Sequence, residues 1–236
     1  MAVRIFETDP AAFPKARPAF ADDLAYRLRA GKTVNDRPVS LPTWRITTGD
    51  PAVAEAVSKL LGGAVEPWET TKEDSLEVIT EADSLRLIID GAHAVESSLV
   101  QFGRSGPPIH VCDGVEFLEP PEDIGKPCGC PALLSERKAQ SKSGRGPSPL
   151  IKVTFRLAES PDLGKGQLTS GSWELLKVLH ELENALDKVA GPALVQLSLE
   201  LVQFTTQTGV DVAFRKPVFK VLGPTPPSAQ GGAADE

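Results

Sequence analysis

The sequence contains few of the residues on which catalytic sites and nucleic-acid-binding sites usually depend. Of its 236 residues, three are cysteine, three are histidine and one is tyrosine, and aromatic residues make up 6%. The histidines stand in neither an H-E-x-x-H nor a triad-like context, and no G-x-x-x-x-G-K-[ST] phosphate loop occurs. So few aromatic residues give little support to a surface on which bases stack. These absences predict a protein that is not an enzyme.

An excess of positive charge and long apolar runs are also lacking. The chain has 25 basic and 32 acidic residues, a net charge of −7, whereas proteins that neutralise phosphates usually carry a basic excess. No stretch approaches the roughly 20 apolar residues that span a bilayer, and the first residues contain no apolar export signal. We therefore expect a cytoplasmic protein, with reduced thiols, no membrane segment and no strong DNA binding of its own. The acidity favours protein partners, basic ones above all.

Strand patterns dominate the chain, and turn residues place three pairs of strands in hairpins. The expected hairpins join residues 76–80 to 84–90, residues 97–103 to 107–114, and the two halves of 194–219. Another strand is expected at 151–157, where apolar and polar residues alternate strictly. Because hairpins outnumber crossover units, we predict an α+β fold with a mainly antiparallel sheet.

Two segments have both the periodicity and the end signals of helices. The first, 51–61, follows Asp50 as N-cap and precedes Gly62. The second, 173–189, follows Ser172 as N-cap and ends before Gly191. A shorter helix is expected from Pro131. The apolar stripe of the second helix consists of Leu175, Leu179, Leu182, Leu186 and Val189.

The composition also suggests how the chain is divided. We expect one domain over residues 1–222, an internal linker near 141–149 where Gly and Ser gather, and a disordered tail at 223–236, rich in Pro, Gly and Ala. Residues 1–40 allow two interpretations. Residues 19–31 have helical spacing, but residues 26–41 fit equally an extended pair of strands that turns at Asn35 and Asp36.

All three cysteines fall within nineteen positions, at Cys112, Cys128 and Cys130. A zinc site needs about four nitrogen or sulfur ligands. His110 precedes Cys112 by two positions, so on a strand both side chains emerge from one face. We therefore predict a structural zinc site at the three cysteines, with His110 as the candidate fourth ligand. The alternatives are thiols without metal and a histidine that is an ordinary strand residue.

Several short stretches occur in an order that points to a known family: "RIFETDP", "VNDRPVSLPTWRITTGDP", "CDG", "CGCP", "VTFRLAESPDLG" and "SGSW". From about Val3 to about Leu222 the chain resembles the recombination directionality factors that accompany large serine integrases in actinobacterial temperate phages and related prophage elements. The resemblance implies a protein without catalytic activity that binds the integrase and switches it from integration to excision. It implies structural roles for the "CDG" and "CGCP" cysteines and identifies no integrase-contact residue.

Two other functions stay open. One is a zinc-containing nucleic-acid-binding accessory protein of phage replication, and the other is an enzyme with an unrecognised site. The support for the first is a single basic cluster, which also fits a solvated helix end that runs into a loop. The cluster consists of Arg137, Lys138, Lys142 and Arg145.

Overall fold

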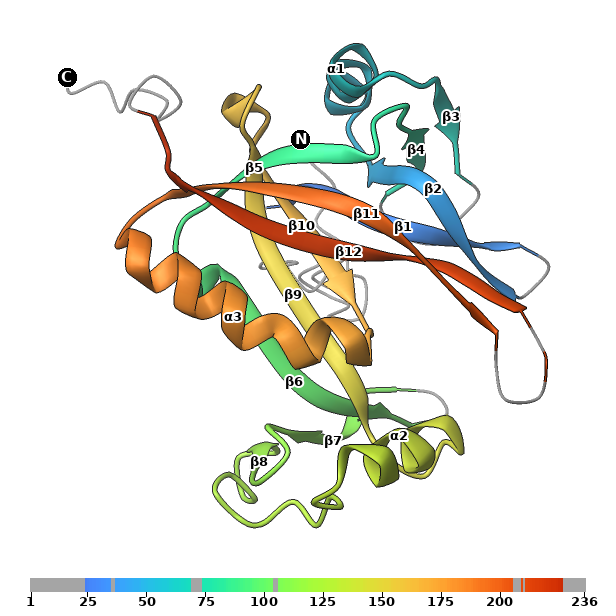
Figure 1. Cartoon of the computed structure of the whole chain (residues 1–236), viewed down its shortest axis with the longest axis vertical. Helices are drawn as coiled ribbons and strands as arrows, with labels where there is room; N and C mark the ends of the chain where they lie inside the picture. Colours follow the sequence, from blue (N-terminus) through green and yellow to red (C-terminus); the bar gives the residue numbers. More distant parts are fainter. Residues whose placement is uncertain are drawn as a thin grey trace, which may run out of the picture.

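The structure, a computed structural model, describes residues 24–34, 37–68, 74–103, 106–205, 209 and 211–226. Within these ranges the chain forms one mixed, mostly antiparallel sheet with three α-helices (Figure 1). The predicted α+β fold with a mainly antiparallel sheet is confirmed. The strands are β1 (Leu24–Val34), β2 (Arg37–Thr48), β3 (Val65–Pro67), β4 (Leu76–Ile79), β5 (Ser84–Ile89), β6 (Val95–Phe102), β7 (Pro108–Cys112), β8 (Phe117–Glu119), β9 (Ser148–Leu157), β10 (Lys165–Ser170), β11 (Ala193–Thr205) and β12 (Asp211–Pro224).

Strand β9 lies at the centre of the sheet and pairs with three neighbours (Figure 1). The sheet has the order β12-β11-β5-β9-β10-β1-β2-β4-β3, and β6, β7 and β8 branch from β9. Among the described pairs only β1 and β10 run parallel, with Leu28 opposite Leu168. Alternate residues of β9 are buried, as the pattern of 151–157 predicts. The branch forms an arm, at the lower end of β9 in Figure 1, that carries the cysteines.

The helices α1 (Pro51–Leu61) and α3 (Trp173–Val189) begin and end as their sequences predict. In α1, the Asp50 side chain accepts a hydrogen bond from the backbone N–H of Ala52, which satisfies one of the free donors at the helix start. In α3, Ser172 accepts from Leu175 in the same way. A third helix, α2 (Leu134–Lys142), begins three residues after the expected Pro131 and contains no buried residue.

A single large core lies between the sheet and the helices α1 and α3. Tyr26 and Trp44 are fully buried, and each has a partner for its polar group: the Tyr26 hydroxyl accepts from the Leu157 N–H, and the Trp44 indole donates to the Asp83 carbonyl. Gly166 lies under the Tyr26 ring, where an added Cβ would collide with it. Four of the five residues of the predicted α3 stripe are buried and Val189 packs at the core's edge.

The predicted hairpin of residues 76–80 and 84–90 is wrong. Strand β4 pairs with β2 and β3, while β5 pairs with β11 and β9. The register places Leu85 opposite Leu197, 112 positions away. Four residues of β5 are buried, so the backbone N–H and C=O groups on both edges of this strand need hydrogen-bond partners. An interior place in the sheet gives it both, whereas a two-stranded hairpin would leave one edge open.

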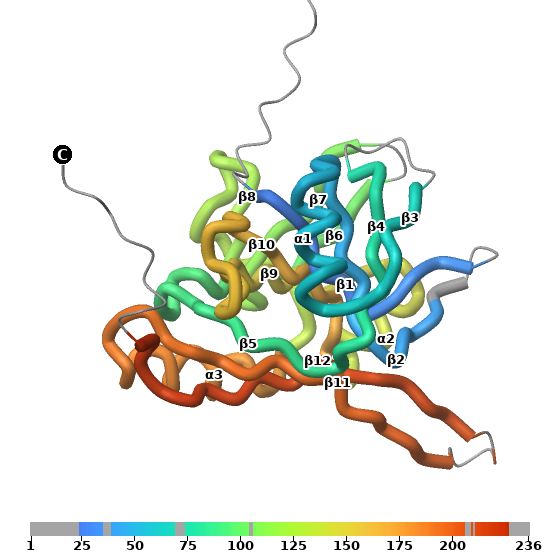
Figure 2. Tube along the Cα trace, turned by 90° about the horizontal axis from the view of Figure 1, so that it is seen from above, coloured from blue at the N-terminus to red at the C-terminus, as the bar shows by residue number. Residues whose placement is uncertain are grey.

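The other two predicted hairpins are confirmed, because β6 pairs antiparallel with β7 and β11 with β12. Of the two interpretations of the N-terminal part, the extended pair is correct over the described residues, since β1 and β2 pair antiparallel. Residues 1–23 lie outside the described ranges. The distal parts of β11 and β12 project from the body as a two-stranded ribbon beside the β1–β2 hairpin (Figure 2).

Two predicted boundaries differ from the structure or gain detail from it. The segment 141–149 holds the end of α2, a short turn and the first residues of β9. The predicted tail begins at residue 223, whereas β12 extends to Pro224 and Thr225 is buried. The N–H of Thr225 donates to the Pro192 carbonyl, 2.9 Å away. Residues 227–236 of the predicted tail lie outside the described ranges.

Candidate metal centre

Four potential ligands meet at the end of the arm formed by β6, β7 and β8. His110 and Cys112 lie two residues apart on β7, so their side chains emerge from one face of the strand. The chain then passes through β8 and a loop and returns with Cys128 and Cys130. Gly129 between these two cysteines has a φ of +72°, a conformation that residues with a Cβ rarely adopt. This turn brings both thiols to the same point.

Two distances within this cluster match those of a tetrahedral zinc site. The sulfur atoms of Cys112 and Cys130 are 3.7 Å apart, and the Cys130 sulfur is 3.6 Å from His110 Nε2. All four ligand atoms, including the Cys128 sulfur, lie within 4.8 Å of one another. Around a tetrahedral zinc with ordinary bond lengths, two sulfurs lie about 3.8 Å apart and a sulfur and a nitrogen about 3.6 Å apart. The four side chains that the sequence predicts therefore come together with a spacing that could hold a metal ion.

Two turns beside the ligands are fixed by hydrogen bonds. The Asp113 carboxylate accepts from the N–H groups of Val115 and Glu116, at 2.7 and 2.8 Å, and these bonds lower the pKa of Asp113. Arg137 of α2 connects the two halves of the cluster. Its guanidinium donates to the carbonyls of Gly114, at 2.7 Å, and of Pro131, at 2.5 Å. One residue therefore bridges the turn after Cys112 and the turn after Cys130.

Burial favours the neutral forms of three of the four candidate ligands, Cys112, Cys130 and His110. Burial raises the pKa of the Cys112 thiol to about 12 and also raises the pKa of Cys130. Burial lowers the pKa of His110, and the neutral imidazole is the form that binds metal. Metal binding requires thiolates, so a metal that enters this site must displace the thiol protons.

The cluster is packed against the rest of the protein on one side. Cys112 and Cys128 form a small apolar cluster with Leu99 of β6, against which Trp173 and Leu176 of α3 pack. The His110 ring lies 4.7 Å from the Phe117 ring, measured between centroids. An ion pair of 2.8 Å between Lys138 and Glu174 joins α2 to α3. The first turn of α3 is therefore in contact with the arm formed by β6, β7 and β8 and the loop after β8, which we call the metal-ligand arm.

The ligand set indicates a structural role for a bound metal. Catalytic zinc sites use three protein ligands and keep one position for water or substrate, whereas structural sites are closed by four. Here four protein ligands surround one point, and they come from a strand and a loop within 21 residues. A metal at this point would join β7 to the loop after β8.

The basic cluster that supports a nucleic-acid-binding function is partly used within the protein. Arg137 bonds to the two carbonyls described above, and Lys138 pairs with Glu174. Arg145 donates to the Ser143 hydroxyl. The bridging role of Arg137 was missed by sequence reasoning, because neither carbonyl leaves a trace in the sequence. Among the described residues, no helix is long and apolar enough to cross a membrane.

The described residues therefore combine a strand-rich sheet with a four-residue cluster that could hold a metal, and the start of a long helix packs beside this cluster. Comparison with known families gives the particular family. The family described as Gp3-like, recombination directionality factor-like, matches residues 26–222. The match covers most of the chain, and the protein belongs to this family, which confirms the resemblance found in the sequence. No solved structure matches the chain.

Proposed function

We propose that this protein is a recombination directionality factor that binds a large serine integrase and switches it from integration to excision. In this proposal it has no catalytic activity of its own, and it acts in the cytoplasm of the bacterial host. The observation that carries the proposal is the family match over residues 26–222, which includes the whole metal-ligand arm and both ends of the sheet. The resemblance to factors that accompany serine integrases supports the finer assignment of the partner.

The proposed activity needs only binding energy. An integrase supplies the nucleophile and most DNA contacts, so the accessory factor has to favour one arrangement of the DNA-bound integrase over another. A ligand shifts such an equilibrium only by its difference in affinity for the two states. A change in preference from 1:99 to 99:1 requires about 5.5 kcal/mol of differential binding. A specific protein interface of ordinary size can supply this amount.

The charge of the protein fits a partner that is itself a DNA-binding protein. A net charge of −7 attracts a basic surface and accelerates encounter with it. The same charge opposes binding to DNA phosphates at physiological salt. The participation of Arg137 and Lys138 in internal contacts further weakens the alternative of a nucleic-acid-binding protein. The proposal therefore places recognition on protein surfaces.

The proposal includes one structural zinc ion held by Cys112, Cys128, Cys130 and His110. The interatomic distances and the three sulfur donors support zinc, which prefers sulfur and nitrogen ligands in a tetrahedral arrangement. Protein purified without chelator should contain about one zinc per chain. Cys128→Ser should lower both zinc content and stability, because metal binding and folding are coupled. A preparation that is folded and free of zinc would refute this part.

The decisive experiment is recombination in vitro with the cognate integrase. Adding the protein should start recombination between the two prophage-end sites and inhibit recombination between the phage and bacterial sites. Bovine serum albumin at the same concentration is the control for nonspecific effects. A gel-shift assay without integrase tests the nucleic-acid-binding alternative. If both reactions are unchanged and the protein does not co-purify with integrase, the proposed function is wrong.

A further inference from the structure

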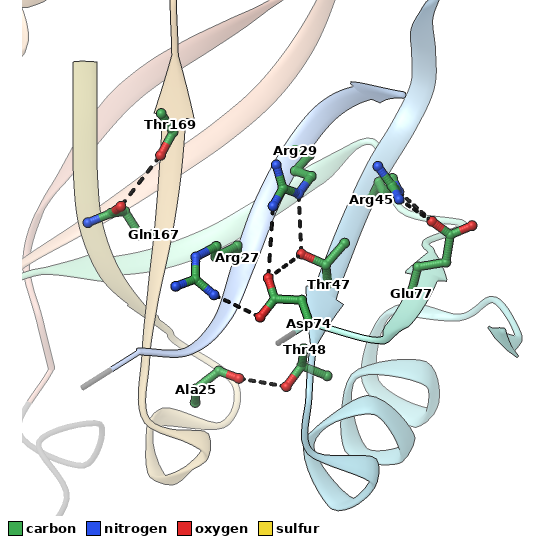
Figure 3. Close-up of polar contacts among 10 residues, drawn as sticks. All are labelled: Ala25, Arg27, Arg29, Arg45, Thr47, Thr48, Asp74, Glu77, Gln167 and Thr169. Atoms are coloured by element: carbon green, nitrogen blue, oxygen red, sulfur yellow. Dashed lines mark hydrogen bonds and ion pairs between the residues drawn. The ribbon is translucent and has the colours of Figure 1, made fainter. Parts of the chain in front are cut away.

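A second polar cluster lies away from the metal-ligand arm, on strands β1, β2 and β4 and the residues that precede β4. Figure 3 shows three arginine side chains around two carboxylates. Arg27 and Arg29 lie two residues apart on β1 and so share a face of the strand, and Arg45 lies on β2. The carboxylates belong to Asp74 and Glu77.

The two carboxylates are already bonded to Arg27 and Arg45. Arg27 donates to Asp74 Oδ1 at 2.7 Å, and the second Asp74 oxygen accepts from the Thr47 hydroxyl at 2.9 Å. Arg45 is bonded to Glu77 at 2.5 Å. Arg29 reaches Asp74 only at 3.8 Å, beyond hydrogen-bond distance, and its Nε donates to Thr47. Three positive groups face two negative ones, so one positive charge of this described set remains unmatched (Figure 3).

The unmatched guanidinium lines a pocket. This pocket has a volume of about 730 Å³ and is bounded by β1, β2, Trp68, Glu77 of β4 and residues 169–171. The guanidinium carbons of Arg29 and Arg45 lie 5.3 and 4.3 Å from the centre of the Trp68 ring. Stacking on an aromatic ring holds the two planar groups in place. Lys32 also lines the pocket and is exposed.

Arg29 is placed where its charge is disfavoured. Burial lowers the pKa of Arg29, the nearby Arg45 charge lowers it further, and the Asp74 charge opposes this only in part. A guanidinium remains protonated in a protein under all ordinary conditions, so Arg29 carries its charge in surroundings that oppose it. A charge retained in such surroundings is typical of a binding site, where a ligand supplies a further counter-charge.

We propose that this pocket binds one carboxylate group of the protein partner, with Arg29 as its principal ligand. The planar guanidinium donates in a fork that matches a carboxylate, and Trp68 offers an apolar surface to the methylene groups that carry it. The proposal rests on the proposed function in that the partner is the serine integrase. The carboxylate would come from an Asp or Glu side chain on the integrase surface that contacts β1 and β2.

A protein carboxylate fits this pocket better than the phosphates of DNA. The pocket has one uncompensated guanidinium in its arginine–carboxylate cluster, is also lined by the exposed Lys32, and lies on a protein of net charge −7. A single side chain that enters the pocket brings one negative charge to the Arg29 guanidinium. A DNA duplex brings a negative charge about every 1.7 Å along its axis, so most of these charges would face an acidic surface.

The first test measures the pocket directly by nuclear magnetic resonance, without the integrase. The reporters are the Arg29 side-chain Nε–H signal and the indole N–H signal of Trp68, identified with Trp68→Phe. Propionate is the carboxylate probe and inorganic phosphate the comparison, at constant ionic strength. Propionate should shift both signals in a saturable way, and the Arg29→Gln variant should abolish the Trp68 shift. Absence of a saturable shift, or a stronger response to phosphate, would overturn the carboxylate site.

The second test measures integrase binding by variants of the full chain. Arg29→Gln should weaken binding about tenfold or more, as loss of a charged contact at an interface does. It should leave the melting temperature unchanged or raise it, because a disfavoured charge is removed. Arg86→Gln is the matched control, since Arg86 is an exposed arginine paired with Glu159 on another part of the surface. Equal binding by both variants, or a large fall in melting temperature with Arg29→Gln, would contradict the proposal.

The two tests separate failure of this inference from failure of the proposed function. If the wild-type protein does not bind the integrase, the proposed function fails, while the propionate titration still reports on the pocket. If the wild-type protein binds and Arg29→Gln binds equally well, only the inference fails. Lys32→Gln provides a second variant at an exposed position of the same pocket, and it should weaken binding in the same direction.

Discussion

Replacing Arg137 by methionine tests whether this residue organises the metal-ligand arm. Methionine keeps the length and the apolar stem of the side chain and removes all the donors. The substitution therefore leaves the carbonyls of Gly114 and Pro131 without the group that joins them. Because these carbonyls follow Cys112 and Cys130 within two residues, the two halves of the ligand cluster should lose their alignment. We expect weaker zinc binding without loss of any ligand.

The two hydrogen bonds set the expected magnitude. Each one joins a charged donor to a carbonyl, and such a bond contributes roughly 1.5–3 kcal/mol. Arg137 is only partly buried, so solvent replaces a share of this energy when the donors are removed. If about 1.4–2.8 kcal/mol is lost from the metal-bound state, zinc affinity falls by about 10- to 100-fold. Loss of groups that support metal ligands has an effect of the same size.

The assay is competition for zinc with a coloured chelator at constant pH. Arg145→Met is the matched control, because Arg145 lies three residues beyond the end of α2 and its guanidinium contacts only the Ser143 side chain among the described interactions. Arg145→Met should bind zinc like the wild type. If Arg137→Met binds zinc within about twofold of the wild type, the bridge between the two turns does not contribute to the site and the reasoning fails.

Three further predictions concern stability. In a urea titration, Leu186→Ala should lower the free energy of unfolding by about 2–5 kcal/mol, because Leu186 is 1% exposed. Val178 is exposed, so Val178→Ala should change the free energy of unfolding by less than about 1 kcal/mol in the same titration. Removing residues 227–236 should leave the unfolding midpoint unchanged, and removal from residue 223 onward should lower it, because Thr225 is buried against the Pro192 segment. The ion pairs with Lys138 and Lys177 lower the pKa of Glu174 from 4.5 to about 2. The stabilisation that these ion pairs provide is complete above pH 4.5 and is lost as the pH falls toward 2. The difference in the free energy of unfolding between wild type and Glu174→Gln should therefore shrink over that range.

The sequence predicted those features whose causes are local. The α3 helix was correct in position, cap and buried stripe, because Ser172 and the leucine spacing act within a few turns of chain. The proximity of the four candidate metal ligands was predictable because all four lie within 21 residues and a single return of the chain brings them together. Such features require no knowledge of which strand lies beside which.

The features that sequence reasoning missed depend on distant partners. The hairpin at residues 76–90 was wrong because β5 obtains its pairing from β11, whose Leu197 lies 112 positions from Leu85. The arginine pocket was missed for the same reason, since Arg29 and Arg45 meet Trp68 only after β2 and β4 are paired. The alternation of Arg27 and Arg29 on one strand face was the signal that the sequence did contain.

The parallel pairing of β1 with β10 has a consequence for the chain while it is being synthesised. Residues 24–28 can pair with residues 165–168 only after the ribosome has added those residues, about 140 positions later. At roughly 5–20 residues per second, one edge of the β1–β2 hairpin stays open for about 7–28 seconds. All four metal ligands are in place by Cys130, well before that edge is covered. The order of synthesis would therefore allow a metal to bind early, and it leaves one edge of the N-terminal hairpin open to mispairing with other chains during that time.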